Sequence, residues 1–200
     1  MQLRIRLYDE PILRQRGEKI TQFDVELKKL TDDMIETMYA IDAGGLAAQQ
    51  VGHALQVFVL DVFESAKRLG DKLKVTLDSK EIPLELIMPF VAINPEFLSL
   101  SPSDVVYEEG CMSFPGNIFL PITRPEGVRL KYQDLAGNVH ELKCEGILAR
   151  CILHEYDHLQ GVLFIDRAKR NDVIRHEAKL KKLQRSTRDF LKAEAKKHDA

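Results

Sequence analysis

Between residues 90 and 144 the sequence divides into short segments rich in β-branched and aromatic residues, and this pattern constrains the fold more than any other feature. Such residues favour strands, and turn-forming pairs such as Asn94-Pro95 and Ser101-Pro102 separate the segments. The predicted strands are residues 90–94, 96–99, 104–108, 127–133 and 139–144. Because a run of strands precedes a helix, we expect an α+β domain with largely antiparallel sheets.

Two stretches have the apolar spacing of a helix. Residues 23–41 repeat apolar side chains every three or four positions, and residues 146–160 do the same up to Gly161, a residue type that often ends helices. Residues 56–62 form a predicted buried strand between them. The polar residues 64–89 contain two prolines, so we expect a loop or insertion there, with room for one short helix or strand.

The length and composition indicate one folded domain. A chain of 200 residues with 44% hydrophobic and 30% charged residues is neither collagen-like nor of low complexity nor wholly disordered. No apolar stretch reaches the roughly 18 residues of a membrane span, and the amino terminus has no continuous hydrophobic export signal. Three cysteines are too few for a disulfide framework, which points to a reducing compartment. We therefore expect a cytoplasmic protein.

The net charge of −2 hides an uneven distribution. Residues 167–200 contain 12 Lys and Arg against 5 Asp and Glu, so this tail carries +7 and residues 1–166 carry −9. Within the tail, Val173, Leu180 and Leu183 form a narrow apolar stripe that predicts a charged amphipathic helix. We divide the chain into an acidic body, 1–166, and a basic helical extension, 167–200. We expect neither DNA nor a membrane as a partner.

Residues 154–158 read His-Glu-Tyr-Asp-His and lie inside the second predicted helix. Histidines four positions apart project from the same side of a helix, so His154 and His158 can bind one metal ion. Glu155, beside the first histidine, can reach a water molecule at that ion. We expect Asp157 to orient a histidine or an arginine.

A third protein ligand is needed, and its identity decides the class of enzyme. In the long metalloprotease motif a third histidine follows, but Phe164 occupies that position and cannot bind metal. Glu177 could complete the site of another kind of metalloprotease, although its charged surroundings favour a solvated side chain. Cys111 is the other candidate, because it precedes a turn-forming Ser-Phe-Pro-Gly segment, an unusual place for a core cysteine. Cys144 and Cys151 are better explained as small buried thiols of the core.

Three motifs follow one another along the chain. Residues 45–50 read Gly-Leu-Ala-Ala-Gln-Gln, residues 109–113 read Glu-Gly-Cys-Met-Ser, and the histidine motif stands at 154–158. In this order they resemble the signature motifs of the peptide deformylase family. The resemblance covers about residues 5–166, including Tyr-Asp-Glu-Pro-Ile-Leu-Arg at 8–14. It implies antiparallel sheets packed around a central metal-binding helix, with a C-terminal helix.

The resemblance implies that Cys111, His154 and His158 bind one divalent metal ion and leave a fourth position for water. A cysteine and two histidines suit zinc, and the same donors accept iron(II), nickel or cobalt. The resemblance implies iron(II) as the native ion, readily replaced by zinc or nickel. Iron(II) beside a thiolate would make the activity sensitive to oxygen.

The implied reaction removes the formyl group from N-formylmethionyl peptides and releases formate and a free amino terminus. Glu155 would act as the general base and return the proton to the departing amine. By position in the motifs, the Gln50 side-chain amide and the Met112 backbone N–H would stabilise the oxyanion. The adjacent Gln49 is the alternative to Gln50.

The substrate would lie among glycines. Gly44, Gly45 and Gly110 would let a nascent peptide bind as an added strand, with its methionine side chain in an apolar pocket. Ile147 and Cys151 lie on the metal-binding face of the predicted helix. They are either walls of this pocket or ordinary core residues, and the sequence leaves both alternatives open.

The chain departs from the family pattern in the first two motifs. Ala43 stands where the first motif usually has a glycine, and alanine disfavours a positive φ. Met112 replaces a common leucine, a change that conserves volume. Two other functions stay open: a metalloendopeptidase with Glu177 as third ligand, and a catalytically silent relative that binds formylated peptide termini or metal.

The basic tail allows two interpretations. It could be a solvated helix that only packs on the body. Because the implied substrate emerges from the ribosome, the +7 charge could also assist docking on ribosomal RNA through attraction to phosphates.

Overall fold

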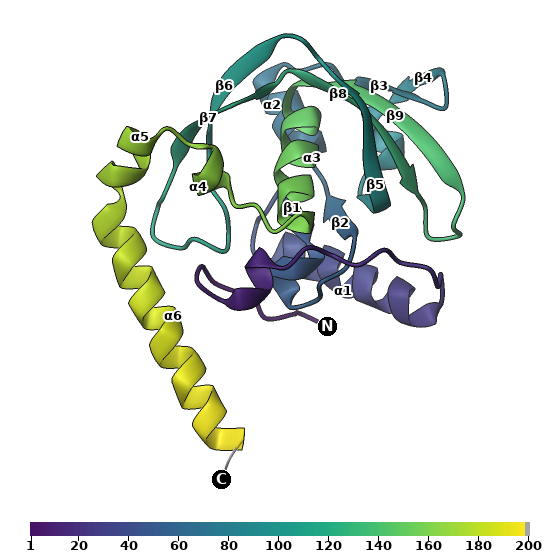
Figure 1. Ribbon diagram of the computed structural model, residues 1–200. Helices are drawn as coiled ribbons and strands as arrows, with labels where there is room; N and C mark the ends of the chain where they lie inside the picture. Colours follow the sequence, from purple (N-terminus) through teal and green to yellow (C-terminus); the bar gives the residue numbers. More distant parts are fainter. Residues whose placement is uncertain (199–200) are drawn as a thin grey trace.

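A seven-stranded antiparallel sheet and a separate two-stranded ribbon lie around a central helix (Figure 1). The structure is a computed structural model that describes residues 1–198, so the last two residues of the predicted tail lie outside the described part. The strands are β1 (Gly45–Ala47), β2 (Val57–Leu60), β3 (Lys74–Leu77), β4 (Lys80–Pro83), β5 (Phe90–Leu100), β6 (Asp104–Glu109), β7 (Leu120–Pro125), β8 (Gly127–Gln133) and β9 (Val139–Glu145). The helices are α1 (Val25–Ala40), α2 (Phe63–Leu69), α3 (Gly146–Leu159), α4 (Phe164–Arg167), α5 (Arg170–Arg175) and α6 (Glu177–His198). Short 3-10 turns cover Pro11–Arg14, Ala48–Val51 and Leu84–Ile87.

The strand order of the large sheet is β1-β2-β5-β8-β9-β3-β4, and every neighbouring pair is antiparallel. β6 and β7 form the ribbon, in which Asp104 lies opposite Pro125 and Glu109 opposite Leu120. α3 runs between the large sheet and the ribbon (Figure 1). The predicted α+β class, with antiparallel sheets around a central helix, is confirmed.

β5 is one strand where two were predicted. Its register against β8 shifts after Ile93, so the ladder passes over Asn94-Pro95 in a bulge. A bulge suits this place because Pro95 has no N–H to donate. Asn94 has a positive φ of 49°, and its side chain pairs with both backbone groups of Ile20. The turn signal therefore marks a bend within a strand rather than the end of one.

Residues 64–89 contain more regular structure than the single short element predicted. α2, β3, β4 and a 3-10 turn occupy them, and β3 pairs with both β4 and β9. Val75 and Leu84 reach the core. The Asp71 carboxylate accepts a hydrogen bond from the Ile147 N–H at 2.7 Å and caps α3, whose own N-cap residue makes no side-chain bond. The segment therefore extends the sheet and supports the central helix.

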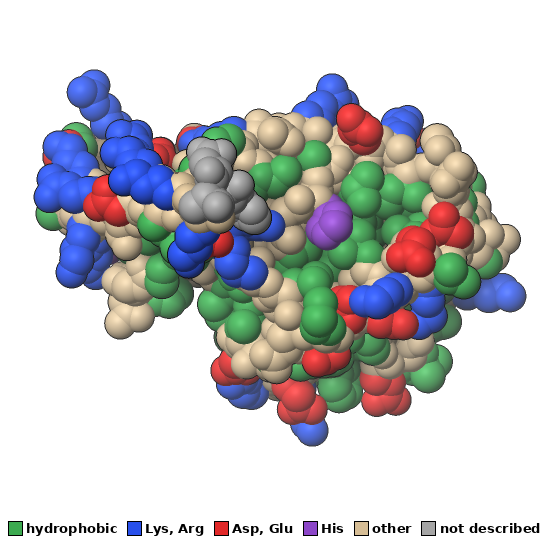
Figure 2. All heavy atoms as spheres, turned by 90° about the horizontal axis from the view of Figure 1, so that it is seen from below, with side chains coloured by type: hydrophobic (Ala, Val, Ile, Leu, Met, Phe, Trp, Pro, Cys, Tyr) green, Lys and Arg blue, Asp and Glu red, His purple; other side chains and the backbone are tan. Residues whose placement is uncertain are grey.

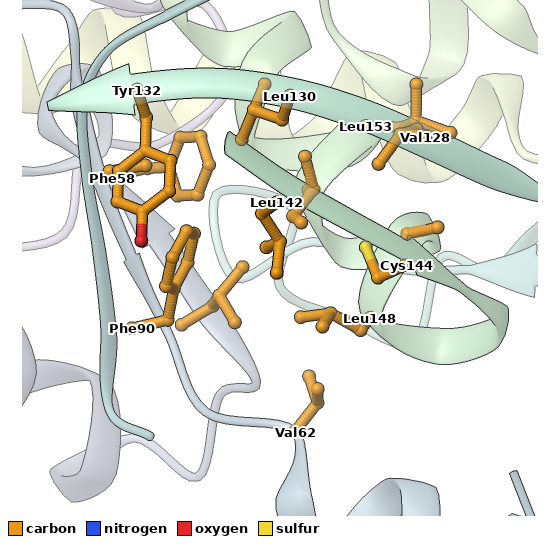
Figure 3. Close-up of a cluster of buried hydrophobic side chains, with 14 of the residues drawn as sticks. Phe58, Val62, Phe90, Val128, Leu130, Tyr132, Leu142, Cys144, Leu148 and Leu153 are labelled. Atoms are coloured by element: carbon orange, nitrogen blue, oxygen red, sulfur yellow. The ribbon is translucent and has the colours of Figure 1, made fainter. Parts of the chain in front are cut away.

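The main core lies between the large sheet and α3 (Figure 3). Phe58, Leu130 and Leu142 point from the strands toward Leu148 and Leu153 of the helix. All five side chains are buried. Burial of a side chain of this size contributes about 1.5–3 kcal/mol, so this cluster holds α3 firmly on the sheet.

α1 confirms the helix predicted over residues 23–41. Asp24 caps it by accepting a hydrogen bond from the Leu27 N–H at 3.0 Å. Leu27, Met34 and Met38 form its buried face and pack in a second cluster with residues of β1 and β2. This packing holds β1, which borders the functional site.

The C-terminal segment forms three helices, and the last of them, α6, projects from the body (Figure 1). Leu180 is buried and Leu183 is partly buried, both in a third cluster with Leu13 beneath the ribbon. Arg188 pairs with Asp9 at 2.5 Å. In Figure 2 the Lys and Arg side chains gather around this projecting part of the chain. No helix in the described part of the chain has the length and apolar character needed to cross a membrane.

Candidate metal centre and active site

α3 presents both predicted histidine ligands near its C-terminal end. The ring centres of His154 and His158 are 5.1 Å apart. The helix ends at Leu159, and Gly161 follows with a φ of 72°, as the predicted helix stop requires. A Cβ at Gly161 would also lie 2.5 Å from the Arg14 carbonyl oxygen, so only glycine fits there.

Cys111 comes from the turn that joins β6 to β7, two residues after β6 ends. The Phe114 N–H donates to the Cys111 carbonyl at 2.8 Å and closes this turn. The Cys111 Sγ lies 3.4 Å from His158 Nε2. One ligand atom from each of Cys111, His154 and His158 lies within 4.8 Å of the other two. The fold thus brings the three predicted ligands together from two separate elements.

The two imidazoles have different surroundings. His154 Nδ1 lies 2.9 Å from a Glu109 oxygen, which leaves Nε2 available for a metal ion. His158 is 1% exposed, and its Nδ1 has no hydrogen-bond partner among the described residues. Burial, helped by the charge of His154, lowers the pKa of His158 well below its ordinary value, so this ring is neutral and has a lone pair to donate.

The pKa of His154 moves the other way. Burial lowers it, but hydrogen bonds to Cys111 and Glu109 outweigh burial and raise it well above its ordinary value. A metal ion at Nε2 would displace this proton, because metal ligands must be deprotonated. A cysteine sulfur and two imidazole nitrogens that converge in this way fit a divalent transition metal.

Glu109 is the centre of a buried network of charges around the site. Its carboxylate accepts hydrogen bonds from Arg124 at 2.6 and 2.9 Å and from Arg150 at 2.8 Å, besides its contact with His154. Arg124 also donates to Asp157 at 2.7 Å, so Asp157 orients an arginine, as the sequence predicted. Burial raises the pKa of Glu109, but hydrogen bonds to His154 and Arg124 lower it by more. The net pKa of Glu109 therefore lies well below its ordinary value.

Glu155 has no such partners. It is 4% exposed, and one of its carboxylate oxygens has no hydrogen bond to any described residue. Burial raises the pKa of Glu155 to about 7. A Cβ at position 45 would lie 2.6 Å from a Glu155 oxygen, so Gly45 is required by this close approach. A buried carboxylate with a pKa near neutrality can both accept and release a proton.

The metal-ligating group opens on a pocket of about 480 Å³. All five predicted substrate-binding residues line it: Gly44, Gly45, Gly110, Ile147 and Cys151. Ile147 and Cys151 line this pocket and also pack against the main core. At the mouth, Met112 is 41% exposed and Phe119 is 52% exposed, with the Phe119 ring lying directly against Gly110.

The comparisons with known proteins agree with this geometry. The model of the polypeptide deformylase family matches residues 2–173. The chain belongs to this family. The peptide deformylase of Opitutus terrae is 44% identical over 193 residues, which cover 96% of this chain and 98% of that protein. Peptide deformylases remove the N-terminal formyl group, so the predicted family, fold and enzymatic function are confirmed.

Solved deformylase structures share the fold. The crystal structure of the peptide deformylase of Thermotoga maritima matches with a TM-score of 0.69 and 41% identity, and the match covers 84% of this chain and 99% of that one. A plant peptide deformylase matches with a TM-score of 0.77 and 34% identity over 94% of this chain and 91% of that one.

The departure from the deformylase motif at Ala43 is accommodated without strain. The positive φ in this stretch belongs to Asp42, at 53°, and not to Ala43. The Ala43 N–H donates to the Met38 carbonyl at 3.0 Å, which closes the end of α1. Alanine therefore fits this position, contrary to the concern raised by the motif.

Gln50 has a defined orientation beside the metal-ligating group. Its Oε1 accepts a hydrogen bond from the Ala47 N–H at 2.8 Å, and its Nε2 lies 3.4 Å from the Cys111 Sγ. Gln49 is completely buried, does not line the pocket, and has no side-chain hydrogen bond to a described residue. The geometry favours Gln50 over Gln49 as the polar side chain of the site.

Glu177, the alternative third ligand, begins α6 and pairs with Lys181 at 2.6 Å. Its side chain is 56% exposed. In residues 1–198 the metal-ligating group contains Cys111 and does not contain Glu177. The geometry gives no support to the metalloendopeptidase alternative.

Sequence reasoning missed the roles of Glu109 and Arg150. Glu109 stands at the head of the second motif, but nothing in the sequence pairs it with a histidine 45 positions away. The position of Arg150 does carry a signal. It is a charged residue one turn before His154, on the same helix face as Ile147. A charge on the buried face of a helix needs a partner, so Arg150 is a sequence signal for a buried ion pair.

Proposed function

We propose that the chain removes the formyl group from N-formylmethionyl peptides at this pocket, with Cys111, His154 and His158 holding one divalent metal ion. The observation that carries the proposal is the convergence of these three donors beside the buried carboxylate of Glu155, one oxygen of which has no hydrogen-bond partner among the described residues. When bound, the ion would polarise the formyl carbonyl and lower the pKa of a water molecule. Iron(II) is our proposal for the resident ion, and zinc, nickel and cobalt fit the same donors.

Glu155 moves the proton in this proposal. Its carboxylate takes a proton from the attacking water, whose oxygen bonds to the formyl carbon. When the bond between the formyl carbon and nitrogen breaks, Glu155 returns the proton to the nitrogen. Formate and a free amino terminus result. The raised pKa of Glu155 suits both halves of this exchange.

The Gln50 amide and the Met112 backbone N–H are the proposed donors to the oxyanion. The hydrogen bond from Ala47 fixes the Gln50 side chain before substrate arrives, with its NH₂ group toward Cys111. Such preorganisation avoids reorientation of the donor during the reaction. Met112 directly follows the cysteine ligand, so its N–H belongs to the same tight turn.

The substrate peptide would extend the large sheet at β1. This strand ends the sheet and pairs with β2 alone among the described strands, so its other edge can accept an extended peptide. Gly44 and Gly45, at the start of β1, line the pocket, and so does Gly110, which directly follows β6. The methionine side chain would then enter the pocket toward Ile147 and Cys151.

We also propose that residues 1–166 are the catalytic unit and residues 167–200 an extension that docks on the ribosome. The positive charge of the extension supports attraction to RNA phosphates, and Leu180 anchors the helix on the body. The cytoplasm as location stays a prediction. Deletion of residues 175–200 should weaken ribosome binding in a salt-dependent manner, and unchanged binding would refute the docking.

One assay tests the central proposal. Protein purified without oxygen and loaded with iron(II) or nickel is given a short formylmethionyl peptide, and formate, free amine and internal cleavage products are measured. We expect formate and free amine in equal amounts, with no internal cleavage. Peptide binding without formate at any metal loading would favour the silent relative, and internal cleavage would favour the endopeptidase.

A further inference from the structure

The metal ligands stand on two elements that no strand pairing joins in the described chain. His154 and His158 belong to α3, whereas Cys111 belongs to the β6–β7 ribbon. The ribbon is a sheet of its own, separate from the seven-stranded sheet. A two-stranded hairpin is only marginally stable alone, so side chains must hold it in place against α3.

Arg150 makes this connection from the helix. Its Nη2 donates to the Val105 carbonyl of β6 at 2.7 Å, and its Nη1 donates to the Ile122 carbonyl of β7 at 3.0 Å. Its guanidinium also lies 5.1 Å from the centre of the Tyr107 ring. One side chain of α3 therefore holds both strands of the ribbon.

Arg124 makes the reciprocal connection from the ribbon. It extends from β7 to α3, where it donates to the Leu153 carbonyl at 3.3 Å and to Asp157. Both arginines donate to Glu109, which in turn holds Nδ1 of His154. Arg150 and Arg124 are 5% and 4% exposed, so these bonds are shielded from water.

We propose that Arg150 is a positioning residue for the metal site: it fixes the ribbon on α3 so that Cys111 meets the two histidines, and it holds Glu109 on His154. This inference rests on the proposed ligand set. Arg150 does not touch the ligand atoms, and it acts through Glu109 and through the strand carbonyls. Partners of this kind in the outer shell of a metal site typically change metal affinity by 10- to 100-fold when they are removed.

The shape of arginine matters for this role. A planar guanidinium can donate to a carboxylate and to two carbonyls at once, whereas an ammonium group is a compact point charge on a flexible stem. A lysine at position 150 could keep the positive charge beside Glu109, but it could not donate hydrogen bonds to all three acceptors at once. A methionine would fill similar space and keep none of them.

The test measures metal affinity rather than turnover. Full-length wild type, Arg150→Met and Arg150→Lys are stripped of metal and titrated with cobalt(II) against a chromophoric chelator, and the thiolate-to-cobalt absorption band is recorded. Circular dichroism verifies that each variant is folded at the temperature used. Arg129→Met is the matched control, because Arg129 also donates twice to a carboxylate, that of Glu141, but on the exposed face of β8.

We expect the cobalt dissociation constant to rise roughly 10- to 100-fold in Arg150→Met and by a smaller factor, about three- to tenfold, in Arg150→Lys. The absorption band should shift or weaken in both, and Arg129→Met should match wild type. If Arg150→Met does not fold, Arg150→Lys decides the matter. Wild-type affinity and an unchanged band in folded Arg150 variants would overturn the inference, even if their stability falls. Failure of wild type to bind cobalt would instead overturn the ligand set.

Discussion

The charged residues around α3 and those along α6 belong to the same residue types but have different surroundings. Glu109, Arg124 and Arg150 are each at most 7% exposed and share one network of hydrogen bonds. On α6, Arg188 is 62% exposed in its pair with Asp9. Removing one member of a buried network leaves an uncompensated charge, whereas exposed pairs are screened by water. Burial therefore decides which charges hold the structure.

The largest effect is expected at Glu155, the buried carboxylate with one oxygen that no described residue pairs. Glu155→Gln keeps the shape of the side chain but cannot accept the proton, so kcat should fall by roughly 10²- to 10⁴-fold. Elemental analysis should show an unchanged metal content, because Glu155 is not among the proposed ligands. Loss of metal together with activity would mean that Glu155 helps to bind the ion.

A buried charge with partners should affect stability most. Arg124→Met leaves Glu109 and Asp157 with fewer donors in a shielded position, and we expect the free energy of unfolding to fall by about 3–5 kcal/mol. Urea denaturation of the metal-free protein measures this change. The exposed Arg129→Met is the control, and an equal loss in both variants would contradict the distinction by burial.

Asp71 tests whether the inserted segment supports the catalytic helix. Asp71→Ala removes the cap at the Ile147 N–H, which should lower the free energy of unfolding by about 1 kcal/mol. Asp71→Asn keeps an acceptor oxygen and should lose less. Equal losses in the two variants would show that the charge of Asp71, rather than its hydrogen bond, stabilises α3.

Glu10 is a third kind of charge, a buried carboxylate paired with the more exposed Arg4, and its effect on stability can be tested by pH. Burial raises its pKa, but hydrogen bonds from Arg4 and the Leu7 N–H lower it more, so the folded-state pKa lies below the ordinary value of 4.5. The stabilisation is therefore present above the unfolded-state pKa and is lost as the pH falls through the folded-state pKa. Glu10→Gln should make the urea midpoint less dependent on pH below roughly pH 5. If the urea midpoint of Glu10→Gln depends on pH as steeply as that of wild type, other carboxylates cause the acid sensitivity.

The smallest effect is expected on α6 itself. Arg188→Ala removes an exposed pair with Asp9, and thermal unfolding should occur at the wild-type temperature within error. Added salt should change the unfolding temperatures of wild type and Arg188→Ala by the same amount. A clear loss of stability would show that charge, and not the packing of Leu180, attaches α6 to the body.

α3 and the candidate metal ligands were predictable from sequence because their signals are local or belong to motifs. The spacing of His154 and His158 defines one helix face, and Gly161 stands where a helix stop is expected. The continuity of β5 was not predictable, because Asn94-Pro95 has the local chemistry of a turn. Because β5 pairs with β8 on both sides of Asn94-Pro95 and Asn94 bonds to Ile20, these residues form a bulge within the strand and not a turn.

The residues by themselves determined the family, the amphipathic helices, the set of candidate ligands and the separation of charge between body and tail. Each of these depends on residue type and on spacing over a few positions. Only the tertiary structure decided which charges are buried together, because Glu109, Arg150 and His154 meet through contacts across 41 and 45 positions. It also decided that Asp71, from a segment that reads as a loop, caps the helix of the metal site. Such contacts depend on how whole elements pack, and no local pattern encodes them.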